Sequence, residues 1–301
     1  MNAEAKENGY FIDGMPNDEY HKPATGLSTS GIKDFMVDPA QYLWSRTAAK
    51  DETKLSALDF GTDFHSYFLE PELFAERYQV LPKFDRRNRG EKQAELDLID
   101  EWKKSGIIPV TNEDMAKLKA MRESALAHPT VAAIMDMQGV AERSYFWTDP
   151  KTEVACKCRP DWLVLDVEDM RPAFIPDDCQ TLVMDVKTIA SVDRIQNQIE
   201  NLKYYVQDAF YTRGISHVTQ TNVCFAFAFV STSLSLGRYP VRVVILDETA
   251  KFDGKQDVSA ALDDYAAMLA SEDENNWQTA ITMDRPSWAT REDDLLLGEY
   301  Q

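Results

Sequence analysis

The sequence lacks the features that would place it in a membrane or in a disulfide framework. No run of about 18 apolar residues occurs in its 301 residues, which excludes a transmembrane helix. The polar residues 1–9 lack the apolar core of a signal peptide. The four cysteines, at 156, 158, 179 and 224, do not have zinc half-site spacing, so we expect buried or ordinary thiols. These absences predict a soluble, cytoplasmic protein that does not bind membranes.

Basic residues are scarce relative to acidic ones. There are 32 Lys and Arg against 51 Asp and Glu, which gives a net charge of −19. This balance argues against a protein that coats DNA with a broad basic surface. It allows a small basic channel, and catalytic metals require carboxylates. We therefore expect divalent-metal dependence and a small DNA footprint if the protein acts on DNA.

Hydrophobic residues make up 44% of the chain, enough for a sizeable core. Residues 1–26 look like an irregular arm. Helices are predicted from capping and apolar spacing over 27–37, 56–69, 91–104, 112–127, 192–214 and 259–270. The first has Ser28 or Ser30 as its N-cap. A loop with three arginines is expected over 84–90.

Strand-like periodicity begins at Glu142. Strands are predicted over 144–148, 154–167, 182–188, 223–231 and 241–246. With the helices, this order predicts an α/β (α+β) fold in which one mixed central sheet is flanked by helices. The long acidic connection 167–181 is expected at the surface, because a buried loop would leave backbone polar groups unpaired.

Asp185 and Lys187 are the most informative residues. Alternation along a strand points residues i and i+2 to the same face, so both side chains would enter one site. A carboxylate among apolar strand residues is costly unless it is paired or metal-bound. Asp185 is thus either part of a structural ion pair with Lys187 or Arg159, or a ligand for a divalent cation. In the second case Asp161 could share the cation, and Lys187 could stabilise a reacting phosphate.

Other candidates also have structural alternatives. His65 on an apolar helix is a metal ligand or a core residue. Gln207 and Tyr211 lie one turn apart and form part of a site or an interhelical contact. Glu142 is a metal ligand or a surface acid. Arg86, Arg87 and Arg89 bind phosphates or belong to a solvated loop.

Four motifs in order resemble the PD-(D/E)xK nuclease superfamily, in its RecB-like branch. They are Gly61-x-x-x-His65, Asp161 after a strand, Asp185-x-Lys187, and Gln207-x-x-x-Tyr211. The stretches around them, together with 40–44, 86–87 and 237–241, resemble the RecE-type exonuclease VIII nuclease domain. This resemblance implies one domain over 27–290. It would comprise a helical part (27–141), a catalytic sheet core (142–250), and a C-terminal helix and extension (251–290), followed by an acidic tail (291–301).

The resemblance also implies roles for these residues. His65, Asp161, Asp185 and the Val186 backbone carbonyl would bind Mg²⁺, with Mn²⁺ as a substitute. Lys187 would assist the attacking water, while Gln207 and Tyr211 would orient DNA or the metal ligands. Glu142 is a further candidate for the catalytic site. Candidate DNA contacts are Ser28, Ser30, Arg86, Arg87, Arg89 and Arg159.

The implied activity is ATP-independent 5′→3′ digestion of linear double-stranded DNA, which releases 5′-mononucleotides and leaves 3′ single-stranded tails. The implied partners are a RecT-like single-strand annealing protein and further copies of the chain in a ring-shaped tetramer. Two alternatives remain open: a RecB-like structure-specific or nicking endonuclease, and a catalytically silent DNA-binding or assembly scaffold.

Overall fold

The computed structural model of the chain describes residues 8–22, 25–46, 59–167 and 173–271. Several predicted features fall outside these ranges. They are the start of the predicted helix at 56–58, the acids at 168 and 169, and the C-terminal extension and acidic tail beyond 271. None of the described helices is long and apolar enough to span a bilayer.

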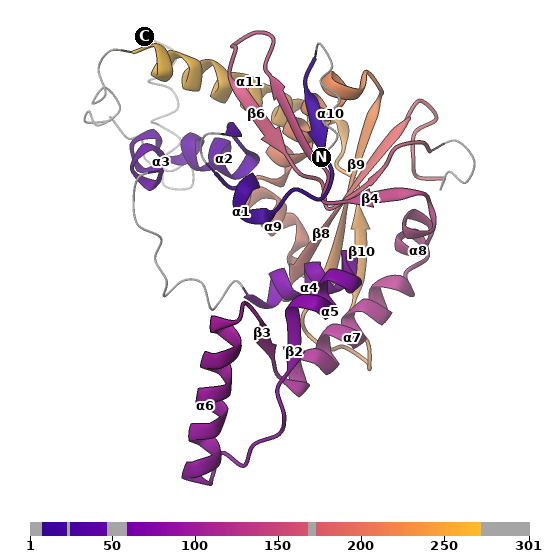
Figure 1. Ribbon diagram of the computed structural model, residues 1–301. Coiled ribbons are helices and arrows are strands. Elements are labelled where there is room, and N and C mark those ends of the chain that lie inside the picture. The colour runs from indigo at the N-terminus through magenta and orange to yellow at the C-terminus, as the bar shows by residue number, and fades with distance from the viewer. Residues whose placement is uncertain (1–7, 23–24, 47–58, 168–172, 272–301) are drawn as a thin grey trace, which may run out of the picture.

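A five-stranded mixed sheet forms the centre of the molecule (Figure 1). Its order is β10-β9-β8-β7-β4; β8 and β9 are parallel and the other pairs are antiparallel. The bounds are β4 (Gly139–Ala141), β7 (Trp162–Val164), β8 (Thr181–Ile189), β9 (Val223–Ser231) and β10 (Val241–Val244). The α/β prediction with a mixed sheet is therefore confirmed.

Helices cover both faces of this sheet. One face packs on α4 (Asp59–Leu69), α5 (Pro71–Arg77), α7 (Asn112–Leu126) and α8 (Pro129–Asp136). The other packs on α2 (Thr29–Val37), α3 (Pro39–Ser45), α10 (Tyr204–Thr219) and α11 (Glu248–Ala270). β8 shows the alternation that a two-sided core requires: Val183 enters the α10 side, whereas Met184 and Val186 enter the α4 side. Asp185 and Lys187 consequently share the face of Val183.

A separate three-stranded sheet, β1-β5-β6, lies on the α10 side. Its strands are β1 (Tyr10–Ile12), β5 (Ser144–Thr148) and β6 (Ala155–Cys158). The irregular arm predicted over 1–26 is wrong for its described part, since Tyr10 pairs with Phe146 and α1 (Asn17–Tyr20) buries Tyr20. A three-residue strand is too short to show periodicity in sequence, but it covers the open edge of β5.

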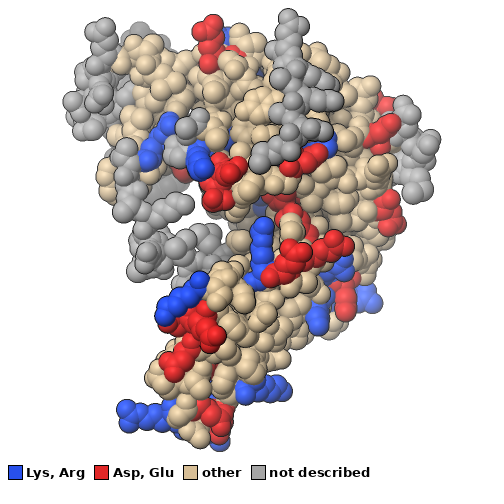
Figure 2. Space-filling view, viewed as in Figure 1, with Lys and Arg blue, Asp and Glu red and all other residues tan. Residues whose placement is uncertain are grey.

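The α6 helix (Arg89–Lys104) extends away from the rest of the molecule (Figure 1). It connects the two-stranded parallel pair β2 (Tyr78–Val80) and β3 (Ile108–Val110). On the face shown in Figure 2, this arm carries acidic and basic side chains together.

The strand predicted over 154–167 is in fact two strands in two different sheets. β6 pairs with β5, whereas β7 pairs with β8 and β4. Pro160 lies between them; it has no N–H for a ladder and restricts the residue before it, so the chain leaves one sheet and enters the other. The prediction of a single sheet is corrected accordingly.

The helix predicted over 192–214 is also divided. It consists of a 3-10 turn (Val192–Arg194), α9 (Ile195–Asn201) and α10, with Lys203 in the left-handed region at φ 48°. Gly214 does not end α10, which continues to Thr219. The glycine instead makes room for the Trp147 ring, with which a Cβ at this position would collide. Two ends also differ from prediction. Pro71 begins α5 as well as following α4, and α11 starts at Glu248 rather than Ser259.

Candidate metal centre

Asp185 lies at the centre of the site, with only 1% of its surface exposed. Its Oδ1 is 2.5 Å from the Lys187 ammonium, and its Oδ2 accepts a 2.6 Å hydrogen bond from Gln207 Nε2. Both side chains of the β8 motif point to one face, as alternation requires. The ion pair expected as the structural alternative is also present, because Lys187 pairs with Asp185.

Asp161 reaches the site from the corner between β6 and β7. Its Oδ2 accepts a 2.7 Å hydrogen bond from the Val186 N–H, which would otherwise lack a neighbour beyond the end of β7. Tyr211 Oη donates to the Arg159 carbonyl at 3.2 Å and so holds the same corner. Gln207 and Tyr211 therefore share a face of α10 and support the two aspartates rather than only packing between helices.

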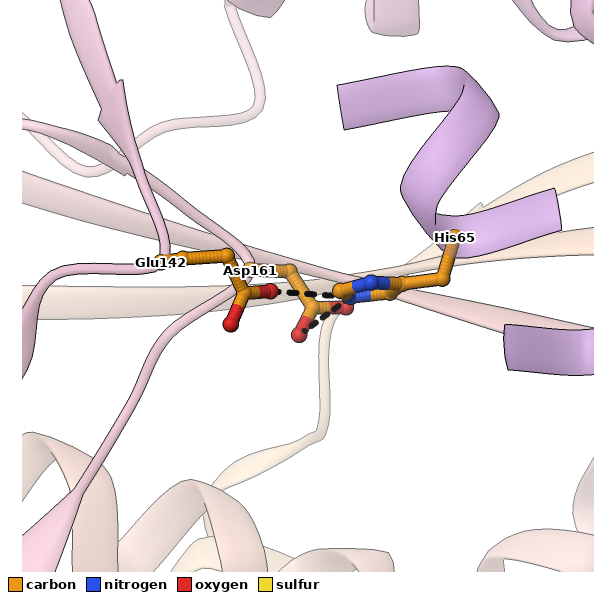
Figure 3. A group of neighbouring side chains, drawn as sticks. All are labelled: His65, Glu142 and Asp161. Atoms are coloured by element: carbon orange, nitrogen blue, oxygen red, sulfur yellow. Dashed lines mark ion pairs between the residues drawn. The ribbon is translucent and has the colours of Figure 1, made fainter. Parts of the chain in front are cut away.

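His65 comes from the opposite side, on α4. Its Nε2 lies 2.9 Å from Asp161 Oδ1 and 3.4 Å from Glu142 Oε1 (Figure 3). One turn earlier, Gly61 lets α4 approach β8 closely, since a Cβ there would lie 3.2 Å from Thr188 Oγ1. The Gly-x-x-x-His spacing thus has a physical reason: the glycine sets the helix position and the histidine reaches the carboxylates.

Glu142 adopts the left-handed backbone conformation, with φ 52°. This conformation is costly for a residue with a Cβ, and such residues gather at functional sites. The Glu142 N–H donates to the Asp161 carbonyl at 3.2 Å, and its carboxylate faces His65 and, at 3.9 Å, Arg159. The side chain therefore points into the site rather than to the surface.

The charges of the site are strongly coupled. Burial alone would lower the pKa of His65, but the carboxylates of Asp161 and Glu142 outweigh it and raise the pKa to about 9. Burial and the charge of Asp161 raise the pKa of Glu142 to about 8 and that of Asp185 to about 6.

Two groups stay charged despite their burial. Burial would raise the pKa of Asp161, but His65, Lys187 and the Val186 N–H lower it overall. Burial would lower the pKa of Lys187, but Asp185 and Asp161 raise it above its usual value.

These residues fit a divalent cation. Three side chains, those of His65, Glu142 and Asp161, each place one ligand atom within 4.8 Å of the others. Asp185 Oδ1 is buried, and its charge is paired with the Lys187 ammonium. It has no other hydrogen-bond donor among the described residues. Carboxylate oxygens suit hard cations such as Mg²⁺ and Mn²⁺. Strand geometry directs the Val186 carbonyl to the same edge of β8 as its N–H, which donates to Asp161.

The candidate DNA contacts are spread over three places. Arg86 forms a forked pair with Glu95 on α6, and Arg87 and Arg89 lie exposed at the start of the α6 arm, outside the site. None of the three is among the residues that line the site pocket of about 470 Å³. Ser28 and Ser30 line an adjoining pocket that shares Asn17, His21 and Arg77 with the first.

Arg159 does not have a free guanidinium. It donates to Ser144 Oγ at 2.8 Å, to Asn17 Oδ1 at 3.4 Å and to the Met15 carbonyl at 3.2 Å. Its guanidinium also stacks over the Tyr20 ring at 4.0 Å. With 8% of its surface exposed, it holds the N-terminal segment and Glu142 in place.

Sequence reasoning missed several charged residues near the site. Asp13, Glu70 and Arg77 line the site pocket. Lys33 on α2 lies over the same Tyr204 ring as Lys187. Its position follows from the packing of α2 against α10, and no local pattern around Lys33 marks it.

The fold and the site together define the class. A mixed sheet presents an aspartate before one strand and an Asp-x-Lys pair on the next, which is the arrangement of PD-(D/E)xK nucleases. Residues 28–275 match the family described as a PDDEXK-like domain of unknown function, DUF3799, and the chain belongs to that family. The superfamily predicted from the motifs is thereby confirmed, and the chain has a PDDEXK-like nuclease domain.

A solved structure agrees at the level of the fold. The crystal structure of a provisionally named exonuclease from Eubacterium rectale matches with a TM-score of 0.50 and 13% identity, over 92% of this chain and 97% of that one. A second structure, SSO0001, matches with a TM-score of 0.28 and 13% identity, over 83% and 89%, which is too low to support an argument. No protein with a curated description matches.

Proposed function

We propose that this chain is a metal-dependent, ATP-independent exonuclease that digests linear double-stranded DNA in the 5′→3′ direction. It would leave 3′ single-stranded tails for annealing-type recombination, as RecE-type nucleases do. The observation that supports this proposal is the convergence of four separated motifs. His65, Asp161, the Asp185–Lys187 pair and Gln207 meet at one buried acidic centre.

A divalent cation at this centre, Mg²⁺ with Mn²⁺ as a substitute, would supply an activated water and neutralise charge on the phosphate. Asp161, Asp185, His65 and the Val186 carbonyl would hold it, with Glu142 on the same side as His65. Gln207 would keep Asp185 oriented through its 2.6 Å hydrogen bond. Such supporting contacts commonly decide whether a ligand set is functional.

Lys187 would act as a fixed positive charge. The raised pKa keeps its ammonium protonated, so it can stabilise the charge that develops on the phosphate and orient the attacking water. It would not serve as the base that removes a proton from that water.

A ring-shaped tetramer would reconcile DNA binding with the net charge of −19. Basic groups could gather toward a central channel while the outside repels DNA. A topologically linked enzyme would also be processive. The proposed consumer of its product is a RecT-like annealing protein. Light scattering that found a monomer under conditions of processive digestion would contradict the ring.

The experiment that tests the activity uses duplex DNA labelled separately at each 5′ and 3′ end, with Mg²⁺ and without ATP. Early release of only the 5′ labels is the expected result. Early release of the 3′ labels would contradict the polarity. Covalently closed circular DNA is the matched substrate: it should stay intact, whereas a nicking endonuclease would open it.

A further inference from the structure

Lys33 belongs to no part of the site described above, yet its ammonium group approaches that site. Its Nζ donates to the Leu202 carbonyl at 3.0 Å and lies 5.5 Å from the centre of the Tyr204 ring. The Lys187 ammonium lies 5.2 Å from the centre of the same ring. Helix α2 therefore brings a second ammonium group toward the lysine of the Asp-x-Lys strand.

The two ammonium groups differ in their partners. Lys187 is neutralised by Asp185, whereas the Lys33 ammonium contacts a neutral carbonyl and an aromatic ring among the described residues. Burial and the charge of Lys187 lower the pKa of Lys33 to about 8, although Asp185 and Asp34 act in the opposite direction. An anion placed near both lysines would relieve this repulsion.

We propose that Lys33 binds a backbone phosphate of the DNA strand next to the scissile phosphate. This inference rests on the proposed nuclease function and adds a substrate-binding residue to it. Lys187 lies beside Asp185 and therefore at the reacting phosphate in the proposed function. The two ammonium groups lie 5.2 and 5.5 Å from the centre of one ring, so they are no more than about 11 Å apart, and Lys33 can meet a neighbouring phosphate of the same strand. A DNA strand carries one negative charge on each successive phosphate. Lysine binds phosphate through a compact positive charge on a flexible side chain.

A purely structural role for Lys33 is the competing explanation. Its bond to the Leu202 carbonyl caps the end of α9, just before the left-handed Lys203 and the start of α10. A cap stabilises the fold but does not sense the charge of one particular phosphate. A test must therefore measure the response to individual phosphates as well as thermal stability.

The first measurement compares wild type with Lys33→Ala and Lys33→Arg in Mg²⁺-dependent digestion. Lys33→Ala should raise KM for duplex DNA at least about tenfold with little change in kcat. It should also reduce the dependence of binding on salt concentration by about one counterion. Lys33→Arg should restore most of the affinity. Lys104→Ala, which removes an exposed lysine paired with Asp100 on α6, is the control and should behave like wild type.

The second measurement replaces single phosphates around the cleavage point with neutral methylphosphonates. For wild type, neutralising the phosphate next to the scissile one should weaken binding. In Lys33→Ala, the same replacement should not weaken DNA binding any further, whereas replacement of other phosphates should still weaken it.

The inference would be overturned if Lys33→Ala and the neutralisation of a phosphate weakened binding additively at every phosphate, including the one next to the scissile phosphate. An unchanged KM in Lys33→Ala would overturn it too. A lower melting temperature with equal losses on all substrates would assign Lys33 to capping instead. Digestion of unmodified duplex by wild type is measured first. Its absence would overturn the proposed function as well, so the two failures are distinguishable.

Discussion

Gln207 and Lys187 hold the two oxygens of the Asp185 carboxylate in one orientation. Gln207 occupies Oδ2 at 2.6 Å, and Lys187 is paired with Oδ1. Because a ligand that rotates binds a cation less well, the glutamine should matter without touching the metal.

Replacing Gln207 by Leu should therefore weaken Mg²⁺ binding by about 10- to 100-fold, because the freed Oδ2 loses its donor. Isothermal calorimetry with Mg²⁺ or Mn²⁺ measures this directly, without DNA. Gln93→Leu, at a glutamine on α6 that bonds Asp97, is the matched control and should bind metal normally. Equal metal affinities of Gln207→Leu and wild type would show that the glutamine does not support metal binding.

Substitution of Glu142 should affect stability and activity in opposite directions. Its left-handed backbone costs about 1 kcal/mol, which glycine would avoid. Glu142→Gly should therefore unfold at the same temperature as wild type or higher, while metal affinity and digestion fall. Glu153→Gly changes a glutamate with φ 58° in an exposed turn, and should gain stability without losing activity. Undiminished metal binding in Glu142→Gly would show that Glu142 is not a ligand.

The main site residues could be predicted from sequence because their motifs are local. Asp185 with Lys187 follows from strand alternation, and Gln207 with Tyr211 from helical spacing. Lys33 could not be found this way, since its position depends on how two helices distant in sequence pack. The burial of Arg159 could not be predicted from the sequence either, because its partners Ser144, Asn17 and Met15 come from other segments.

At the scale of elements, the close approach of α4 to β8 positions His65. Gly61→Ala should push α4 outward by a few tenths of an ångström, because the new Cβ would meet Thr188 Oγ1 at 3.2 Å. Metal affinity should fall several-fold, even though alanine improves helix propensity by up to about 1 kcal/mol.

The double variant Gly61→Ala/Thr188→Ala removes that hydroxyl and should recover the lost metal affinity. Metal titration of wild type, both single variants and the double variant forms a complete cycle. If the two changes add independently, the helix–strand contact does not set the position of His65.

Element boundaries were predictable where one period ran without interruption, as in β5, β8, β9 and α7. They failed where tertiary contacts redirect the chain. The 154–167 segment reads as continuous strand, but Pro160 moves it from one sheet to another, and this places Asp161 beside β8. Likewise, Gly214 resembles a helix end but instead makes room for Trp147.

At the scale of the whole molecule, the acidic centre couples folding to pH. His65 has its pKa raised from 6.5 to about 9 and Glu142 from 4.5 to about 8. Between about pH 6.5 and pH 7.5 these two groups bind more protons in the folded protein than in the unfolded chain. The free energy of unfolding must therefore fall as pH rises. Asp161, whose pKa is lowered, has the opposite effect at acid pH. Lys33 and Lys157, whose pKa values burial lowers to about 8, oppose the trend above about pH 7.5.

Urea denaturation in the presence of a chelator should accordingly show stability decreasing between about pH 6.5 and pH 7.5. Mg²⁺ should stabilise the protein more at pH 8 than at pH 6.5, because metal and protons compete for the same groups. His65→Asn should flatten the profile. Stability that rises over this interval in chelator would contradict the charge coupling described for the site.

If the Asp185 centre hydrolyses DNA, digestion must depend on the charge of this carboxylate. Wild type and Asp185→Asn, which keeps shape and removes a charge, are incubated with linear duplex DNA and Mg²⁺ while released nucleotides are measured. We predict digestion by wild type and its loss, by at least about 100-fold, in Asp185→Asn with an unchanged circular dichroism spectrum. Equal release by both proteins would show that Asp185 is not part of a nuclease site, and no release by wild type with either Mg²⁺ or Mn²⁺ would show that the protein does not digest DNA.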